Sequence, residues 1–257
     1  MERLRHHFTR PLTLLASRLS QLAYPPRCAG CNGLLPEQTP WCPQCWSELA
    51  LTTAKPCCPT CAAPLGPYQT LNSLHQCNQC KKHSPKIKSI CRLGTYDGVL
   101  SQIVRSLKYN KNTYSGNLLA DWLADKVADQ PWLDEIDGFC PIPMHWTRRW
   151  LRRIDHTKII ADRLSNHTHL PVIQALRRPK PTPQQVGLSH TARMKNIKNA
   201  FKINPRWPIE GATLCLVDDV MTTGATLFEA ARTLKTAGAA KIYAAILAKA
   251  DNWDAYT

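Results

Sequence analysis

The chain has 257 residues, and its 33 Lys and Arg against 18 Asp and Glu give a formal net charge of +15. With 44% hydrophobic residues it can bury a core, which excludes a wholly disordered chain. No run of about 18 apolar residues occurs, which predicts no membrane span. Residues 1–24 lack a signal-peptide pattern, so we expect a cytoplasmic protein.

The positive charge is unevenly placed. Residues 139–206 carry 14 Lys and Arg against only Asp155 and Asp162, a local net charge of +12. A stretch of this sign and density favours polyanionic ligands.

The first 90 residues divide into two parts. In residues 1–24, Leu12, Leu15, Leu19 and Leu22 recur at helical spacing and predict a short amphipathic helix that ends before a Pro-Pro break. Its short length favours packing on the protein over contact with a membrane. Residues 25–90 are rich in Cys and Pro but poor in aliphatic side chains, so we expect a small module that folds only when it is cross-linked or metal-bound.

Four Cys-x-x-Cys pairs lie in this module. Two residues between two thiolates let one turn present both sulfurs to a single ion, and two such turns complete a tetrahedral zinc site with four cysteine ligands. The expected ligands, enough for one or two structural zinc ions, are Cys28, Cys31, Cys42, Cys45, Cys58, Cys61, Cys77 and Cys80. Pairing in sequence order gives two zinc ribbons; interleaved pairing, iron–sulfur ligation and a redox dithiol for one pair are the alternatives.

The other four cysteines have a different character. Cys57 could compete as a ligand because it neighbours Cys58. Cys91, Cys140 and Cys215 lie in apolar settings that are typical of small core residues.

Helical and strand-like patterns alternate over residues 91–257, which predicts an α/β domain with a parallel sheet flanked by helices. We expect the boundary with the Cys-rich module near residues 81–91. Residues 180–201 are polar and interrupted by Pro, which predicts a loop or hairpin. The expected helices are 96–109, 115–127, 157–164 and 226–237, and the expected strands are 139–143, 213–217 and 241–248.

The most specific motif follows the strand predicted at 213–217. Carboxylates at the carboxyl end of a strand, here Asp218 and Asp219, can accept hydrogen bonds from vicinal ribose hydroxyls. Gly224 permits a positive φ, and three Thr hydroxyls beside the amides of a helix N-terminus predict a monophosphate cradle without a Walker lysine. A simple capped turn explains fewer of these residues. The predicted site comprises Asp218, Asp219, Val220, Met221, Thr222, Thr223, Gly224, Ala225 and Thr226.

On this motif the sequence resembles the type I phosphoribosyltransferases, whose phosphoribosyl pyrophosphate (PRPP) loop has this pattern. Over nearly its whole length it is similar to the ComF family of bacterial competence proteins. The similarity lies in Pro-Pro-Arg-Cys-Ala-Gly-Cys at 25–31, the further Cys pairs, Leu-Lys-Tyr at 107–109, Pro-Ile-Pro at 141–143, Gln-Val-Gly-Leu at 185–188, and Arg-Met-Lys-Asn at 193–196 leading to Ala-Phe at 200–201. One departure occurs at 153–157, where Arg-Ile-Asp-His-Thr replaces the usual Arg-Gly-Phe-Asn-Gln.

The resemblance implies a type I phosphoribosyltransferase-like sheet that binds PRPP with Mg²⁺. It also implies that the segment after Pro143 is the pyrophosphate loop and that residues 185–196 form a flexible loop over the site. Family members are linked to natural transformation, which implies single-stranded DNA as a ligand and a competence helicase or recombination-mediator proteins as partners.

The basic stretch supplies a second candidate surface. Arg residues there alternate with Trp146 and Trp150 and would line one side of a helix. Arg forks can bind pyrophosphate, and Arg with Trp can hold a single strand by charge and stacking; a solvated basic face is the alternative. The predicted pyrophosphate or DNA surface comprises Lys108, Arg148, Arg149, Arg152, Arg153 and Arg193.

Two functional hypotheses follow. The first is a competence protein that binds PRPP and single-stranded DNA during uptake and processing of transforming DNA. The second is an active phosphoribosyltransferase that acts on an unidentified base or nucleotide, although no catalytic residue or acceptor pocket can be assigned. A zinc-dependent transcription factor is disfavoured because no recognition-helix or finger pattern with His ligands occurs.

Overall fold

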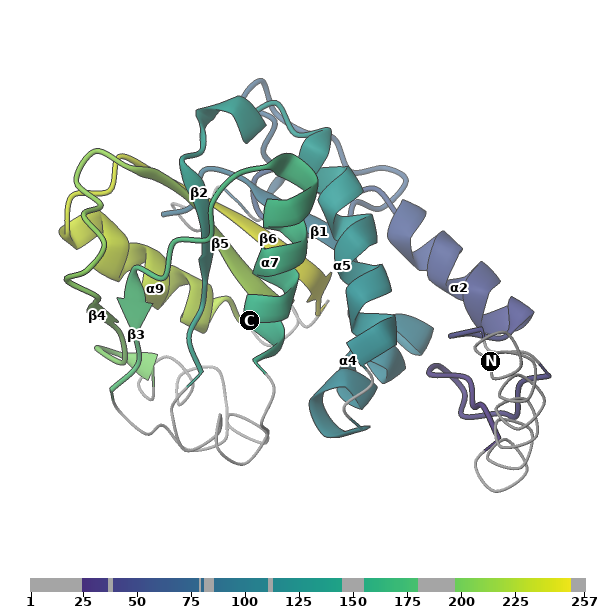
Figure 1. Ribbon diagram of the computed structural model, residues 1–257. Helices are drawn as coiled ribbons and strands as arrows, with labels where there is room; N and C mark the ends of the chain where they lie inside the picture. The colour runs from purple at the N-terminus through teal and green to yellow at the C-terminus, as the bar shows by residue number, and fades with distance from the viewer. Residues whose placement is uncertain are drawn as a thin grey trace, which may run out of the picture.

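The central element is a parallel four-stranded sheet with strand order β1-β6-β5-β2 (Figure 1). The computed structural model describes residues 25–36, 39–78, 80, 86–110, 113–144, 155–179 and 197–250. The strands are β1 (Ile90–Thr95), β2 (Gly138–Pro141), β5 (Thr213–Met221) and β6 (Lys241–Lys249). The expected α/β class with a parallel sheet is therefore confirmed.

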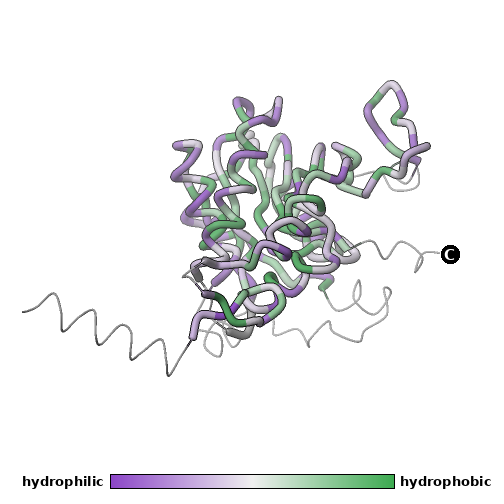
Figure 2. Tube along the Cα trace, turned by 90° about the vertical axis from the view of Figure 1, so that its right-hand side faces the viewer, coloured by the Kyte–Doolittle hydropathy of each residue, from purple (hydrophilic) through white to green (hydrophobic). Residues whose placement is uncertain are grey.

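Helices cover both faces of this sheet and bury its side chains. Helices α4 (Gly98–Asn110), α5 (Thr113–Ala128) and α7 (His156–Thr168) pack on one face, and α9 (Ala225–Thr236) packs on the other. The hydrophobic residues gather along the strands in the middle of the molecule (Figure 2). Cys91, Cys140 and Cys215 are all buried there, which confirms them as core residues.

Both edges of the sheet are covered, which protects unpaired strand groups from other chains. At the β2 edge, the Phe139 N–H donates to the Pro171 carbonyl at 2.9 Å and the Ile173 N–H donates back to the Phe139 carbonyl at 2.8 Å. At the β1 edge, the Ile90 N–H donates to the Pro59 carbonyl at 3.1 Å, so the Cys-rich module caps this side. Directly after this contact with β2, the chain enters β3 (Leu176–Arg177). This strand pairs with β4 (Lys202–Ile203) in a short antiparallel hairpin.

The Cys-rich module contains a helix, α2 (Pro43–Ala54), that the sequence pattern did not predict. Cys42 caps its N-terminus, a Pro occupies its first turn, and Leu49 is fully buried. The cysteines interrupt the apolar periodicity by which such a helix is recognised. Strand β1 and a 3-10 turn, η1 (Leu133–Glu135), were also missed.

Some predictions fall outside the described residues, namely the amphipathic helix in 1–24 and most of the polar loop at 180–201. The division of the chain near residues 81–91 stays a prediction. Among the helices of the described ranges, none is long and apolar enough to cross a bilayer.

Candidate functional site

Two groups of four cysteines converge within the Cys-rich module. In each group the four sulfurs all lie within 4.8 Å of one another. The groups follow sequence order: Cys28, Cys31, Cys42 and Cys45 form the first, and Cys58, Cys61, Cys77 and Cys80 form the second. The structure therefore has the sequential pairing rather than the interleaved one, and Cys57 belongs to neither group.

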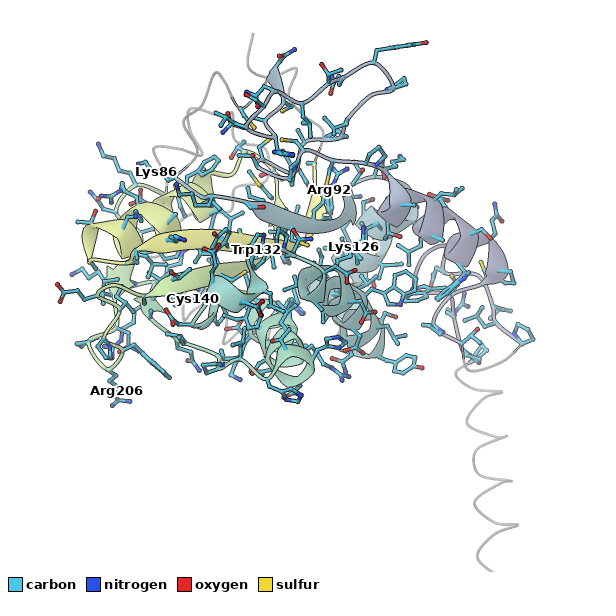
Figure 3. The ribbon with its side chains drawn as sticks, turned by 90° about the horizontal axis from the view of Figure 1, so that it is seen from above. Lys86, Arg92, Lys126, Trp132, Cys140 and Arg206 are labelled. Atoms are coloured by element: carbon cyan, nitrogen blue, oxygen red, sulfur yellow. The ribbon has the colours of Figure 1, made fainter. Side chains whose placement is uncertain are left out.

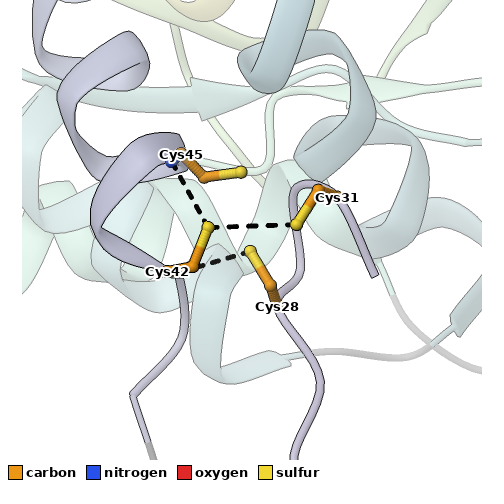
Figure 4. A group of neighbouring side chains, drawn as sticks. All are labelled: Cys28, Cys31, Cys42 and Cys45. Atoms are coloured by element: carbon orange, nitrogen blue, oxygen red, sulfur yellow. Dashed lines mark hydrogen bonds between the residues drawn. The ribbon is translucent and has the colours of Figure 1, made fainter. Parts of the chain in front are cut away.

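The first group sits where a tight turn meets the N-terminus of α2 (Figure 4). The Cys42 N–H donates to Cys28 Sγ at 3.3 Å, and the Cys45 N–H donates to Cys42 Sγ at 3.5 Å. Burial raises the pKa of the Cys28 thiol, but hydrogen bonds from the backbone of Cys42, Cys31 and Gly30 outweigh it and bring the pKa down to about 7. The turn is thus built to stabilise a thiolate, the form that binds metal.

The second group has the spacing of a tetrahedral metal site. Zn–S bonds of about 2.3 Å place the sulfurs of a tetrahedron about 3.8 Å apart. The observed Sγ separations are 3.6 Å for Cys58 to Cys80, 3.6 Å for Cys61 to Cys77 and 3.8 Å for Cys77 to Cys80. A hydrogen bond from the Cys61 thiol is the main cause that lowers the pKa of Cys58, to about 4. The residues present therefore fit zinc.

The predicted phosphate cradle lies between the end of β5 and the start of α9. Gly224 is the N-cap of α9 and has φ +74°, the left-handed conformation that a glycine permits. A Cβ at this position would lie 2.6 Å from the Phe228 ring and 2.7 Å from the Met221 side chain. The Thr223 hydroxyl accepts a hydrogen bond from the Ala225 N–H at 3.3 Å. Glycine is therefore needed here both for its φ and for the close approach of its neighbours.

The other residues of the motif divide by burial. Asp218 and Asp219 are half-buried near the end of β5, with the Asp219 N–H donating to Asp218 Oδ1 at 2.9 Å, and Thr222 is exposed. Met221 and Ala225 are buried in the core, so only their backbone groups could reach a ligand. Val220 is partly buried and packs on the other face of the sheet, against the core formed with α4, α5 and α7. Thr226 is half-buried at the start of α9.

Strand β2, after which the predicted pyrophosphate segment begins, lies beside β5. Pro141 pairs with Val217, and the Ile142 N–H donates to the Val217 carbonyl at 3.0 Å. The departure from the family pattern now has a structural role, because Asp155 caps α7 by accepting from the Lys158 N–H at 3.3 Å. The Thr157 hydroxyl lies 2.8 Å from Asp155 Oδ1 and 2.9 Å from the Ile142 carbonyl, so it joins this cap to the end of β2.

The predicted basic surface is largely untested. Lys108 lies on α4, whereas Arg148, Arg149, Arg152, Arg153 and Arg193 lie outside the described residues. One basic residue beside the motif was missed: Lys249, at the end of β6, pairs with Met221 and is only 1% exposed. A lone Lys that closes an apolar strand is the signal by which it could have been found.

Comparison with known proteins agrees with both halves of this description. Residues 19–81 match the double zinc ribbon domain, and residues 157–254 match the phosphoribosyl transferase domain. Competence protein F of Haemophilus influenzae is 28% identical over 232 residues, covering 87% of this chain and 97% of that protein. The chain therefore pairs a double zinc ribbon domain with a phosphoribosyl transferase domain, and it is homologous to competence protein F.

Other relatives of the chain carry a different name. The DNA utilization protein YhgH of Escherichia coli (strain K12) is 28% identical over 197 residues, covering 75% of this chain and 84% of that protein. The YhgH protein of Salmonella typhi is 29% identical over 189 residues, covering 72% and 80%. The double zinc ribbon match and the two four-cysteine groups together support structural zinc.

Two solved structures align with part of the chain. The allosteric regulatory enzyme of purine biosynthesis aligns over 51% of this chain and 25% of its own, with 19% identity and a TM-score of 0.36. The purine phosphoribosyltransferase of Pyrococcus horikoshii Ot3 aligns over 53% and 83%, with 17% identity and a TM-score of 0.32.

Proposed function

We propose that this chain is a cytoplasmic competence protein of the ComF family. It would bind PRPP with Mg²⁺ at residues 218–226 and single-stranded DNA at its basic surface. The observation that carries the PRPP part is the left-handed Gly224 at the N-terminus of α9, directly after the half-buried Asp218 and Asp219. The names of the relatives, competence protein F and DNA utilization protein, support the DNA part.

The cradle would bind the ligand through the groups just described. The amides of residues 223–226, at the positive end of the α9 dipole, would hold the 5′-phosphate. The carboxylates of Asp218 and Asp219 would accept hydrogen bonds from the ribose hydroxyls. Bound Mg²⁺ would supply charge neutralisation of the pyrophosphate.

Calorimetric titration of the full chain with PRPP, with and without Mg²⁺, tests this site. We expect Asp218→Asn/Asp219→Asn to weaken binding at least about 10-fold, because two acceptors for the ribose hydroxyls are weakened and two charges are lost. The matched control is Asp121→Asn/Asp125→Asn, which removes two carboxylates of surface ion pairs from α5, outside residues 218–226. Equal affinities in the two double variants would contradict the proposal.

The DNA surface is tested by the salt dependence of binding to a labelled oligothymidylate. We expect Arg152→Ala/Arg153→Ala to reduce the slope of log K against log salt by about 1.4, the value for two phosphate contacts on a single strand. Adding Arg148→Ala and Arg149→Ala should deepen the loss. The control, Lys86→Ala/Lys88→Ala, removes equal charge from two exposed lysines before β1. If both doubles lower the slope equally, the basic run is not the DNA surface.

The alternative is an active phosphoribosyltransferase, which the phosphoribosyl transferase domain match favours. Pyrophosphate release from PRPP in the presence of a panel of bases and nucleotides tests it. Release that Asp218→Asn/Asp219→Asn abolishes would establish the enzyme, and no release with any acceptor would leave the binding function.

A further inference from the structure

A cavity of about 340 Å³ lies beside the end of β2, between the first turn of α7 and the β3–β4 hairpin. Part of its wall is apolar and part is basic. The apolar side includes Pro143, Met144 and Leu176, and the cations are Lys158, Arg177 and Arg178.

The lining carries three cations against one carboxylate; Lys158 pairs with Asp162 at 2.7 Å on the protein surface, and the two Arg side chains are held by other contacts. Asp155 is the single carboxylate among the described lining residues, and its Oδ1 accepts from the first turn of α7. Arg177 donates to Asn204 Oδ1 at 2.6 Å, while Asn204 Nδ2 donates to the Gln174 carbonyl at 3.0 Å. Arg178 lies over the Phe201 ring at 5.5 Å. The two guanidinium groups are therefore positioned before any ligand arrives, which lowers the entropy cost of binding an anion.

Size and lining together restrict the ligand. Sites for small molecules range over about 300–1,000 Å³, so this cavity suits a ligand at the small end. Its basic side suits a phosphate, since Arg and Lys bind phosphate oxygens by charge-assisted hydrogen bonds. Its apolar side suits a flat ring. We propose that the cavity binds one nucleoside monophosphate unit, with its phosphate at Lys158 and Arg177 and its base against Pro143 and Met144.

This site is separate from the cradle at 218–226, although both lie at the carboxyl end of the sheet and Met144 falls in the segment that the family resemblance assigns to pyrophosphate. The cavity shares no residue with positions 218–226, yet its wall residue Pro141 pairs with Val217, which directly precedes Asp218. Neighbouring strands are about 4.8 Å apart, so the cavity and the cradle flank adjacent strands. The molecule would thus present two phosphate-binding positions, and the second does not depend on whether PRPP binds the first.

Calorimetry on the zinc-loaded full chain, with thymidine monophosphate as the probe, tests the proposal. We expect it to bind at least about 10-fold more tightly than thymidine, which lacks the phosphate, and than inorganic phosphate, which lacks the base. Undetectable binding at millimolar nucleotide, or equal affinity for thymidine, would overturn the proposal.

Two variants locate the site. Gln174→Glu adds a negative charge at the cavity, and the hydrogen bond of Gln174 to Asn204 uses its backbone carbonyl. Lys158→Gln removes one cation, and the surface pair that it breaks with Asp162 contributes little to stability. We expect each to weaken nucleotide binding about 5- to 10-fold. The control, Arg206→Gln, removes an equal charge from the turn that follows β4, outside the cavity lining (Figure 3).

Two further measurements distinguish this site from the cradle and show whether the bound nucleotide is free or is the end of a DNA strand. If Asp218→Asn/Asp219→Asn abolishes nucleotide binding while Gln174→Glu and Lys158→Gln leave it unchanged, the nucleotide occupies the cradle and the proposal is wrong. Oligothymidylate with a 5′-phosphate is compared with the same strand carrying a 5′-hydroxyl. Tighter binding of the phosphorylated strand, lost in Gln174→Glu, identifies a DNA end as the ligand; equal binding identifies a free mononucleotide.

Discussion

The two four-cysteine groups share one turn but have different surroundings. In each, the N–H of the first cysteine donates at 2.8 Å to the carbonyl five residues later, from Cys28 to Gly33 and from Cys58 to Ala63. The residue after the second cysteine has a positive φ in both, 61° at Asn32 and 57° at Ala62. The ligand turn is therefore repeated, even though the sequence shows little repetition beyond the cysteines.

The first group is part of the main hydrophobic core. Cys28 and Cys45 belong to the same cluster as the side chains of α4, α5 and α7. Trp41 packs against Trp46 and Trp122, with ring centroids 5.6 and 5.8 Å away, which joins α2 to α5.

A half-buried lysine adds a polar link between this module and the sheet. Lys126 of α5 donates to the Thr53 carbonyl at 2.5 Å and to the Leu93 carbonyl at 3.1 Å, and so connects the last turn of α2 to β1 (Figure 3). Burial lowers the pKa of Lys126, and the two carbonyls satisfy its hydrogen bonds.

The second group forms a small cluster of its own. Cys58, Cys77 and Cys80 pack with Ala63 and a few half-buried side chains, separate from the two larger cores. It meets the sheet edge mainly through Pro59 and Ala62. The same cysteine turn can thus belong to the main core or to a small separate cluster, and the side chains that pack around it determine which of the two it joins.

The largest expected difference comes from breaking one group at a time. Cys45→Ser should lower the global free energy of unfolding by on the order of 3 kcal/mol or more, because metal binding and core packing are lost together. Cys77→Ser should leave the main unfolding transition near its original midpoint while residues 55–80 become sensitive to protease. Zinc analysis should show about one ion fewer in each variant. Equal losses of global stability would refute the distinction between core and satellite.

Removing a side chain that packs on the first group should also destabilise the protein more than removing one that packs on the second group. Trp122→Ala should cost about 2–3 kcal/mol, since a half-buried indole leaves a cavity between α5 and the first group. Leu71→Ala, beside the second group, should cost about 1 kcal/mol because Leu71 is partly exposed and packs on a small cluster. Urea unfolding followed by circular dichroism measures both. A larger loss for Leu71→Ala would reverse the comparison.

The polar contacts to the rest of the chain allow a finer test. Glu48 of α2 accepts from the Val99 N–H at 2.9 Å and so caps α4, and Glu48→Ala should cost about 1 kcal/mol. Ser89 donates to the Pro59 carbonyl at 2.6 Å beside the second group, and Ser89→Ala should cost about 0.5–1 kcal/mol. The two variants should differ in hydrogen exchange, with faster exchange at the start of α4 in the first and at β1 in the second.

The smallest expected effect lies in the repeated turn. Asn32→Ala should cost about 0.5–1 kcal/mol because Ala tolerates a positive φ less well than Asn, while Asn32→Gly should be neutral within a few tenths. At the equivalent position, Ala62 is fully buried. Glycine there would remove the backbone strain of a positive φ but would also remove a packed methyl group, so Ala62→Gly should change stability little. Chemical denaturation of the three variants checks this. A stabilising Asn32→Ala would show that the turn is not strained.

The sequence predicted those parts in which a short pattern maps directly onto geometry. The Cys-x-x-Cys spacing led to two four-cysteine groups, and the strand–glycine–helix motif led to a left-handed Gly224 at the start of α9. Helix α2 was missed because its apolar positions are shared with metal ligands. The helix cap at Asp155 was missed because the sequence showed only that the usual family residues are absent at 153–157. The hydrogen bonds that Asp155 and Thr157 make include one to the Ile142 carbonyl after β2, which lies far away in the sequence.

By itself the sequence determined the class of fold and the eight cysteines of the two groups, and it predicted where the phosphate motif lies, because each depends on residues close together in the chain. Tertiary structure alone decided how the cysteines pair, that the first group enters the main core, and that the second covers the edge of β1. It alone placed Lys158 and Arg177 around one cavity beside β2. These features join residues from distant segments, and only packing selects which segments meet.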